Sequence, residues 1–345
     1  MEFLKPLFEE QVTTEVSASG EIVIGGITLS PIRILKQTET YEQAFKNWKD
    51  DHFELCLIKA EEILKLFDNR ARYSRLLNTF ERNGFVLPFV GAGMSCPSGF
   101  RTWTEYLWML QSESHILPDE LKALIDSGQY DLAAERLLAD LGERLFNERL
   151  HTSYRASRET PVNGAVHYLP LLFNKSVITT NFDNVLESVY LANNFGFTRF
   201  LHGTDGQALN RFLAEGEFCL YKIHGDFALP STRILTAREY DVAYANDSPL
   251  TETLKWVLRS YTFLFLGCSL NQDRTMQLMQ LLAREVADLP THYAFLATPT
   301  DDDERRIRGK VLAERNIFPI WYPAEEHDES IEALFVKLLS DMNAL

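Results

Sequence analysis

The sequence predicts an α/β protein built on a Rossmann-like parallel sheet, with an inserted small helical subdomain and an N-terminal appendage. Three observations lead to this prediction. Short apolar runs alternate with helical patterns over most of the chain, as in sheets whose strands are joined by right-handed crossovers. Several of these runs end in glycine or in polar residues. The first 82 residues do not share this alternation.

The N-terminal segment, residues 1–82, is expected to be an appendage. Residues 21–29 indicate two short strands about a Gly25–Gly26 turn. Residues 41–82 have a helical pattern, which Gly84 ends. The recurring apolar residues are Leu55, Leu57, Ile58, Ile63, Leu64 and Leu66. We expect this segment to pack on the main domain or on a neighbouring subunit.

The main domain is predicted to span residues 83–325, and a final helix at residues 326–345 to pack on it. Its first strand is the buried run Phe85-Val-Leu-Pro-Phe-Val. An insertion at residues 102–160 carries helical spacing at 102–110, 119–126, 132–141 and 144–151. Further strands are predicted at 176–180, 197–201, 218–223, 262–266, 293–297 and 317–321. In such a sheet, ligands bind beyond the carboxyl ends of the strands.

Composition narrows the functional classes. The net charge is −15 and no basic cluster is evident, so direct nucleic-acid binding is not expected. The apolar run at 261–270 is about half as long as a bilayer span, and the N-terminus lacks a signal pattern. We therefore expect a cytoplasmic protein without a membrane segment. The four cysteines form no C-x-x-C pair, so neither a zinc site nor a disulfide framework is predicted.

The first predicted strand ends in Gly91-Ala92-Gly93-Met94-Ser95. Glycines let a backbone approach a pyrophosphate closely, and Ser95 adds a hydroxyl donor. The third glycine of the dehydrogenase fingerprint is absent, and the acid expected about 20 residues further on would fall in a helical region. Hydride transfer is therefore disfavoured, whereas a plain tight turn remains an alternative.

The next strand ends in Thr179-Thr180-Asn181-Phe182-Asp183. An amide and a carboxylate two residues apart at a strand end can both face a ligand. The Asn181 amide can donate and accept, so it can hold a ribose hydroxyl or a water molecule. The Asp183 carboxylate can accept from a carboxamide, or it can cap the helix that follows.

Two later strand ends complete the pattern. His224 is followed by glycine, and its titration range suits a general base, although a structural role is the alternative. Gly267 permits close approach, and Ser269 can donate to a phosphate or a ribose. Asp273 follows, either as part of the site or as an acid at a helix start.

Together, these strand ends resemble the sirtuin family over roughly residues 85–325, through its G-A-G-x-S, T-x-N-x-D, H-G and G-x-S patterns. The resemblance implies an NAD-binding site. Asn181 would orient the ribose and position a water molecule, His224 would act as general base, and Asp183 would hold the carboxamide. The other NAD-binding residues implied are Gly91, Ala92, Gly93, Ser95, Gly267 and Ser269.

Departures from the sirtuin pattern refine this hypothesis. The two zinc-binding C-x-x-C pairs and the F-G-E segment of protein-deacylating sirtuins are absent, and Phe182 stands in place of the isoleucine of N-I-D. These features resemble the bacterial sirtuin-like branch of anti-phage defence. That resemblance implies an enzyme that hydrolyses NAD to nicotinamide and ADP-ribose, without zinc, and depletes NAD in an infected cell.

Two alternatives remain open. The protein could bind NAD or ADP-ribose as a sensor or scaffold without turnover, or, with less support, it could be an NAD-dependent protein deacylase. A constitutive NAD hydrolase would kill its own host, so control by assembly is expected. The partners implied are a second copy of the chain, forming a homo-oligomer, and by family analogy a HerA-type ATPase.

Overall fold

The computed structural model describes residues 1–19, 22–24, 27–82, 86–156, 160–270, 274–286 and 288–345. The predicted Gly25–Gly26 turn, Gly84, Phe85 and Asp273 lie outside these residues. Strands β1 (Ile22–Ile24) and β2 (Ile27–Leu29) pair antiparallel, as predicted. Within the described residues, no helix has both the length and the apolar character that a membrane crossing requires.

A seven-stranded sheet forms the centre of the molecule, and all its pairings are parallel. Its spatial order is β5-β6-β4-β3-β7-β8-β9. The strands are β3 (Val86–Val90), β4 (Val177–Thr179), β5 (Arg199–His202), β6 (Cys219–Lys222), β7 (Thr262–Leu266), β8 (His292–Ala297) and β9 (Ile317–Tyr322). The predicted Rossmann-like α/β class is therefore confirmed, and the chain order reverses on either side of β3.

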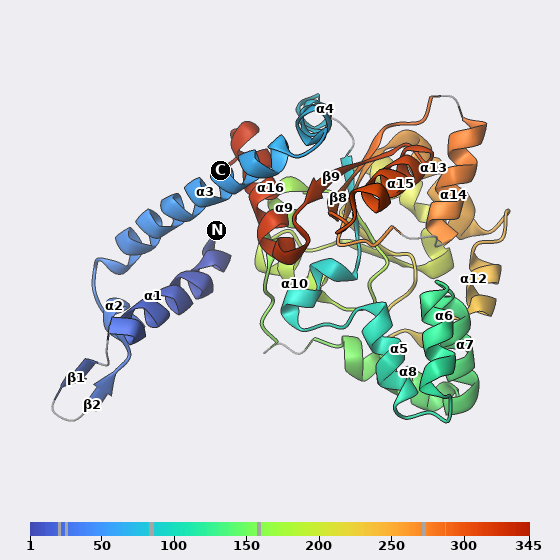
Figure 1. The fold of residues 1–345 in the computed structure, drawn as a ribbon, viewed down its shortest axis with the longest axis horizontal. Coiled ribbons are helices and arrows are strands. Elements are labelled where there is room, and N and C mark those ends of the chain that lie inside the picture. Colours follow the sequence, from blue (N-terminus) through green and yellow to red (C-terminus); the bar gives the residue numbers. More distant parts are fainter. Residues whose placement is uncertain (20–21, 25–26, 83–85, 157–159, 271–273, 287) are drawn as a thin grey trace.

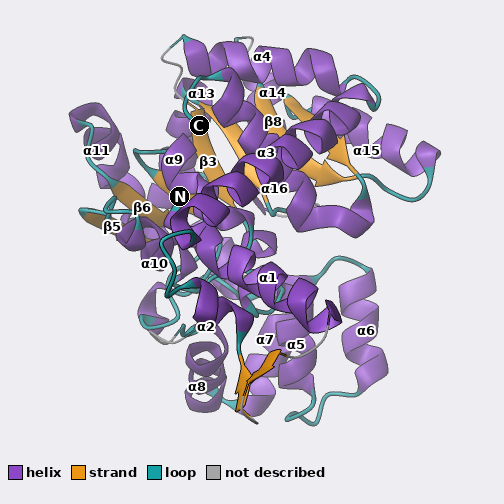
Figure 2. Ribbon diagram, turned by 90° about the vertical axis from the view of Figure 1, so that its left-hand side faces the viewer, coloured by secondary structure: helices purple, strands orange, loops and turns teal. Residues whose placement is uncertain are grey.

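Helices cover both faces of the sheet because side chains alternate along each strand. Leu264 and Leu266 of β7 pack into one core, and Phe263 and Phe265 pack into the other. The first face is covered by α3 (Tyr41–Lys65) and α16 (His327–Asp341), which lie across the sheet in Figure 2. The second face is covered by α11 (Leu209–Glu215), α13 (Pro249–Ser260) and α14 (Arg274–Glu285).

Four helices that follow β3 lie together at one end of the molecule (Figure 1). They fall within the insertion expected at residues 102–160. They are α5 (Trp103–Gln111), α6 (Pro118–Asp126), α7 (Tyr130–Leu141) and α8 (Glu143–Tyr154). The remaining helices of the main body are α9 (Leu169–Leu172), α10 (Val185–Ala192), α12 (Ala237–Ala243) and α15 (Asp302–Ala313).

The N-terminal segment forms an arm that extends from the main body (Figure 1). It contains α1 (Lys5–Ser19), which the sequence analysis did not predict, and α2 (Pro31–Leu35). The helical pattern predicted at 41–82 is divided into α3 and α4 (Asn69–Glu81). The break falls at Phe67, whose φ of 47° cannot continue a right-handed helix. On α3, the side chains of Leu55 and Ile58 are 66% and 52% exposed, so they do not join the core.

Candidate active site

The predicted site residues lie at the carboxyl edge of the sheet. Val90 of β3 pairs with Thr179 of β4 and with Leu266 of β7, and Thr179 pairs in turn with Lys222 of β6. The residues that follow these four strand ends therefore meet at one edge, where the chain order reverses. This is the position at which open α/β sheets bind ligands.

Three glycines bring the loops after β3 and β7 into contact. The Gly91 N–H donates to the Leu266 carbonyl at 2.8 Å, and the Gly93 N–H donates to the Gly267 carbonyl at 2.9 Å. Gly267 has a φ of 63°, and a Cβ there would lie 2.5 Å from the Met94 nitrogen. The glycines are thus required by loop-to-loop packing. The two N–H groups expected to meet a pyrophosphate are used within the protein in this structure.

The Asn181 side chain is held at the edge of this contact. Its Nδ2 donates to the Gly91 carbonyl and to the Ser95 Oγ, both at 3.1 Å, and its backbone N–H donates to the Thr179 Oγ1 at 3.0 Å. The side chain is only 5% exposed. Among the described residues its Oδ1 has no hydrogen-bond partner. A buried amide oxygen without a partner is costly, so a ligand or a water molecule is expected to bond to it.

A small cavity of about 10 Å³ lies beside Asn181. Its lining residues are Ala92, Trp103, Tyr154, Asn181, Phe182 and Asp183. Sites for drug-sized ligands usually have about 300–1,000 Å³. The cavity therefore has room for about one water molecule, and a dinucleotide can enter only if the lining side chains move apart.

The Asp183 carboxylate lines the same cavity and also supports α10. Its Oδ1 accepts from the Val185 N–H at 3.0 Å, in the first turn of that helix. Burial raises the pKa of Asp183, although the positive charge of Lys222 and a hydrogen bond from Ser95 oppose the shift. The N-cap of α10 is Asn184, so the prediction that Asp183 caps this helix is wrong, although its carboxylate bonds to the N–H of the first helical residue.

Lys222 bonds to residues that follow two neighbouring strands, β4 and β6. It was not among the predicted site residues. This lysine is 1% exposed. Its Nζ donates to the carbonyls of Phe182 and Asp183 at 3.2 and 2.6 Å, and to the carboxylates of Glu187 and Asp226. Burial alone would lower the pKa of Lys222, but the charges of Glu187 and Asp226 raise it. The ammonium group therefore stays charged and fixes the loop that carries Asn181.

His224 lies at the same edge but is covered by two tyrosines of the α12 region. Its Nε2 lies 2.9 Å from the Tyr244 hydroxyl, and its Nδ1 lies 3.4 Å from the Tyr240 hydroxyl. Burial lowers the pKa of His224 to about 3, so the ring is neutral at pH 7. The Tyr244 hydroxyl also lies 3.0 Å from the Thr275 Oγ1 of α14. The predicted base is thus present, but its ring nitrogens face protein hydroxyls.

The structure brings some predicted residues together and leaves others apart. Asn181, Asp183 and Ala92 line one cavity, whereas His224 does not line it. No hydrogen bond among the described residues joins Asn181 to His224. The Ser269 side chain is exposed on the loop after β7, where its carbonyl accepts from Arg308.

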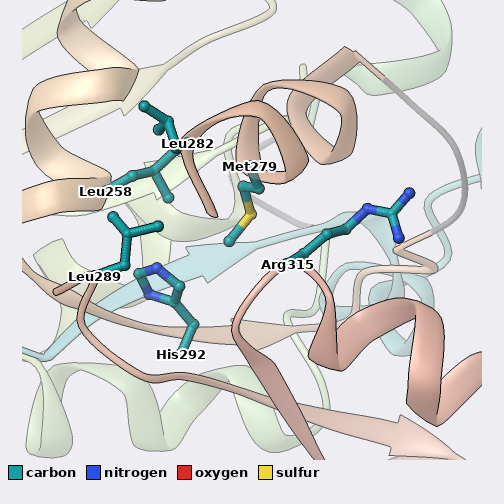
Figure 3. A pocket seen from close by; sticks show the side chains of 6 residues that line it. All are labelled: Leu258, Met279, Leu282, Leu289, His292 and Arg315. Atoms are coloured by element: carbon teal, nitrogen blue, oxygen red, sulfur yellow. The ribbon is translucent and has the colours of Figure 1, made fainter. Parts of the chain in front are cut away.

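A second gap, too small for a water molecule, lies at the opposite edge of the sheet (Figure 3). Its lining includes His292 at the start of β8 and Arg315 just before β9, together with leucines and Met279. Because ligands of such sheets bind at the carboxyl ends of the strands, this apolar cavity is a packing gap and not a candidate site.

Sequence reasoning missed Lys222, Tyr240, Tyr244 and Tyr154. A lysine inside the apolar run of β6 was the available signal, because a charge in a buried strand requires partners. The tyrosines carried no such signal, since aromatic residues at helical spacing are common in cores.

The sequence was compared with protein-family models and with characterised proteins. Residues 175–320 match the model of the SIR2-like domain. Over this part the chain is similar to the SIR2-like domain. The match includes Asn181, Asp183, His224 and Gly267, and the glycine loop at 91–95 lies before it.

Two relatives of this chain are named NAD(+) hydrolase ThsA. The one from Acinetobacter baumannii is 30% identical over 205 residues, covering 59% of this chain and 40% of the relative. The one from Cytobacillus dafuensis is 26% identical over 255 residues, covering 69% of this chain and 46% of the relative. Defense-associated sirtuin 2 of Bacillus subtilis is 25% identical over 222 residues, covering 61% of this chain and 21% of the relative. The chain thus spans less than half the length of these relatives.

Proposed function

We propose that this protein hydrolyses NAD at the bond between nicotinamide and ribose. The observation that carries the proposal is the buried Asn181 Oδ1, which has no partner among the described residues and belongs to a side chain lining the cavity at the sheet's switch point. The similarity to the SIR2-like domain and the two relatives named NAD(+) hydrolase support NAD as the substrate.

The chemistry requires orientation more than acid catalysis. Nicotinamide in NAD is a cationic leaving group, so the C1′–N bond breaks with its electron pair returning to the ring nitrogen. Water then forms the new C1′–O bond and releases one proton. Asn181 would hold the ribose or that water molecule, Asp183 would bond to the carboxamide, and His224 would accept the proton. The loops that carry Gly91, Ala92, Gly93, Ser95, Gly267 and Ser269 would hold the rest of NAD.

The biological role that follows is bacterial antiviral defence by NAD depletion in the cytoplasm, in the manner of abortive infection. The names of the relatives support this role. We further propose that activity depends on assembly, either with a second copy of the chain or with a HerA-type ATPase. The N-terminal arm, with the exposed Leu55 and Ile58 on α3, is the surface we assign to such contacts.

Product analysis tests the proposed reaction. NAD incubated with the pure protein, with and without its genomic neighbour, should give nicotinamide and ADP-ribose in equal amounts. In H₂¹⁸O the label should enter ADP-ribose. Asn181→Ala and His224→Ala should each lower turnover by about a hundredfold or more. The matched controls are Asn193→Ala, at the C-terminal cap of α10, and His115→Ala, at an exposed position. Both variants should retain turnover.

Binding without turnover is the second candidate function. The observation that favours it is that Tyr240 and Tyr244 cover His224. The proposed base is then out of reach of a ligand. Tight binding of NAD or ADP-ribose with no product, even with the partner present, would establish a sensor. Nicotinamide release that strictly requires an acyl-lysine peptide would instead establish a deacylase.

A further inference from the structure

A cluster of metal-ligand side chains lies away from the candidate active site, between α3 and α16. His52 and Cys56 are one turn apart on α3, and Glu332 faces them from α16. The three ligand atoms all lie within 4.8 Å of one another. The His52 Nε2 is 2.9 Å from the Glu332 Oε1 and 3.7 Å from the Cys56 Sγ. We propose that these three residues bind a zinc ion that joins the N-terminal arm to the main domain.

The distances fit one small ion. Ligands of a tetrahedral zinc ion lie about 2.0–2.3 Å from the metal, which places nitrogen and oxygen about 3.3 Å apart and nitrogen and sulfur about 3.6 Å apart. The nitrogen–sulfur distance already has this value. The nitrogen–oxygen pair needs to open by only a few tenths of an ångström, which a rotation of the Glu332 side chain supplies.

The donor set also suits zinc in charge and type. A thiolate and a carboxylate together balance the charge of Zn²⁺, and imidazole is a preferred neutral ligand. The nearby Lys59 does not oppose binding, because its ammonium is paired with Glu326 at 3.1 Å. The ion pair between His52 and Glu332 and the contact between His52 and Cys56 join these side chains in pairs. One shared ion would account for the convergence of all three ligand atoms.

Neighbouring side chains hold two of the ligands in place. The Tyr168 hydroxyl donates to the Glu332 Oε1 at 2.7 Å. The His52 ring stacks on Trp48 with centroids 5.0 Å apart and an interplanar angle of 9°. Such second contacts fix ligand orientation and commonly change metal affinity by about 10–100-fold. The side chains of His52 and Glu332 are 18% and 15% exposed, so an ion can enter from solvent.

The state of Cys56 makes metal binding pH-dependent. Zinc binds a cysteine as the thiolate, so an ion that binds here displaces the thiol proton of Cys56. Zinc affinity should rise with pH, and binding should release one proton per ion into a weakly buffered solution.

Metal titration of the full chain tests the site. The chelator-treated protein should bind one equivalent of Zn²⁺ by calorimetry, and Co²⁺ should give a thiolate-to-metal charge-transfer band. Cys56→Ala should abolish that band, and Glu332→Gln should weaken binding about tenfold or more. Cys219→Ala in β6 and Glu329→Gln, an exposed residue of α16, are the matched controls. No stoichiometric binding, or equal losses in the controls, would overturn the proposal.

A labelling experiment keeps the test valid if a variant folds poorly. In the unaltered chain, Zn²⁺ should slow alkylation of Cys56 several-fold and leave the alkylation rate of Cys96 unchanged. Equal rates at Cys56 with and without Zn²⁺ would contradict the site. Neither readout requires NAD turnover, so the outcome is independent of the proposed enzymatic function.

Discussion

The two halves of the candidate active site differ in how their polar atoms are satisfied. On the Asn181 side, a buried amide oxygen has no partner among the described residues and a cavity adjoins it. On the His224 side, both ring nitrogens face tyrosine hydroxyls, and the ring does not line the cavity beside Asn181. One half thus has a polar atom that a ligand or a water molecule can bond to, and the other half is covered by tyrosine side chains.

This difference indicates which part of the structure controls access to His224. Both halves stand on neighbouring parallel strands, β4 and β6, whose backbones are fixed by register. The cover over His224 comes instead from Tyr240 of α12 and from Tyr244, its C-terminal cap residue. Exposure of the histidine therefore requires a shift of this short helix and not of the sheet. The difference between the Asn181 side and the His224 side can be tested by substitution.

The largest effect on stability is expected at Lys222, which joins the two halves of the site. Lys222→Met removes the cation that bonds both to the Asn181 loop and to Asp226, and it leaves two carboxylates without their partner. The free energy of unfolding should fall by about 3–5 kcal/mol, measured by urea titration. Lys122→Met removes an exposed ion pair with Asp126 and should cost less than about 1 kcal/mol. Similar losses in the two variants would contradict the joining role.

The loop contact beneath the Asn181 side gives the next effect. Gly267→Ala places a Cβ 2.5 Å from the Met94 nitrogen in a left-handed conformation, so it should cost about 2 kcal/mol or more and reduce NAD turnover. Gly309→Ala on α15 meets no atom within 4 Å and should stabilise the protein by up to about 1 kcal/mol. Thermal unfolding of both variants checks this contrast, which fails if Gly267→Ala is neutral.

The closed state of His224 should appear in the pH dependence of stability. Its pKa is about 3 in the folded chain and about 6.5 when unfolded, so the unfolded state binds more protons between these values. The contribution is fully present above pH 6.5 and is lost as pH falls towards 3, by on the order of 1 kcal/mol per pH unit. His224→Gln should flatten urea midpoints measured from pH 7 to pH 5.

A second buried histidine contributes to the same pH dependence. His292, whose pKa burial also lowers to about 3, should keep part of the slope in the His224 variant. If His224→Gln leaves the slope unaltered, the ring is open to solvent in solution.

The smallest effect on stability is expected at the tyrosine cover. Tyr244→Phe removes the 2.9 Å bond to His224 and the 3.0 Å bond to Thr275, at a cost of about 1 kcal/mol. It should also raise NAD turnover several-fold, because the histidine is released. Tyr240→Phe removes the longer contact to His224, of 3.4 Å, and should change turnover less. Lower turnover in Tyr244→Phe would show that the hydroxyl assists the reaction.

Much of the fold was predictable because buried strands and amphipathic helices leave periodic signals. The strand runs of the sheet were confirmed within two residues and the four insertion helices within three. The clustering of Asn181 and Asp183 beside the glycine loop followed from the rule that parallel strands share a carboxyl edge.

The parts that sequence reasoning missed depend on tertiary contacts. Nothing in the sequence indicates that Phe67 breaks the long helix, or that Leu55 and Ile58 stay exposed. The internal use of the Gly91 and Gly93 N–H groups depends on β7, which lies far along the chain. The cover over His224 likewise needs the position of α12, which periodicity does not give.

The contact between the glycine loops has a consequence for synthesis of the chain. Gly91 and Gly93 are made early and their partners Leu266 and Gly267 are made late, so the glycine loop cannot be fixed beside Asn181 until β7 has emerged from the ribosome. A chain that ends before β7 lacks the two carbonyl groups that hold this loop. The proposed hydrolysis of NAD would therefore have to await the synthesis of β7.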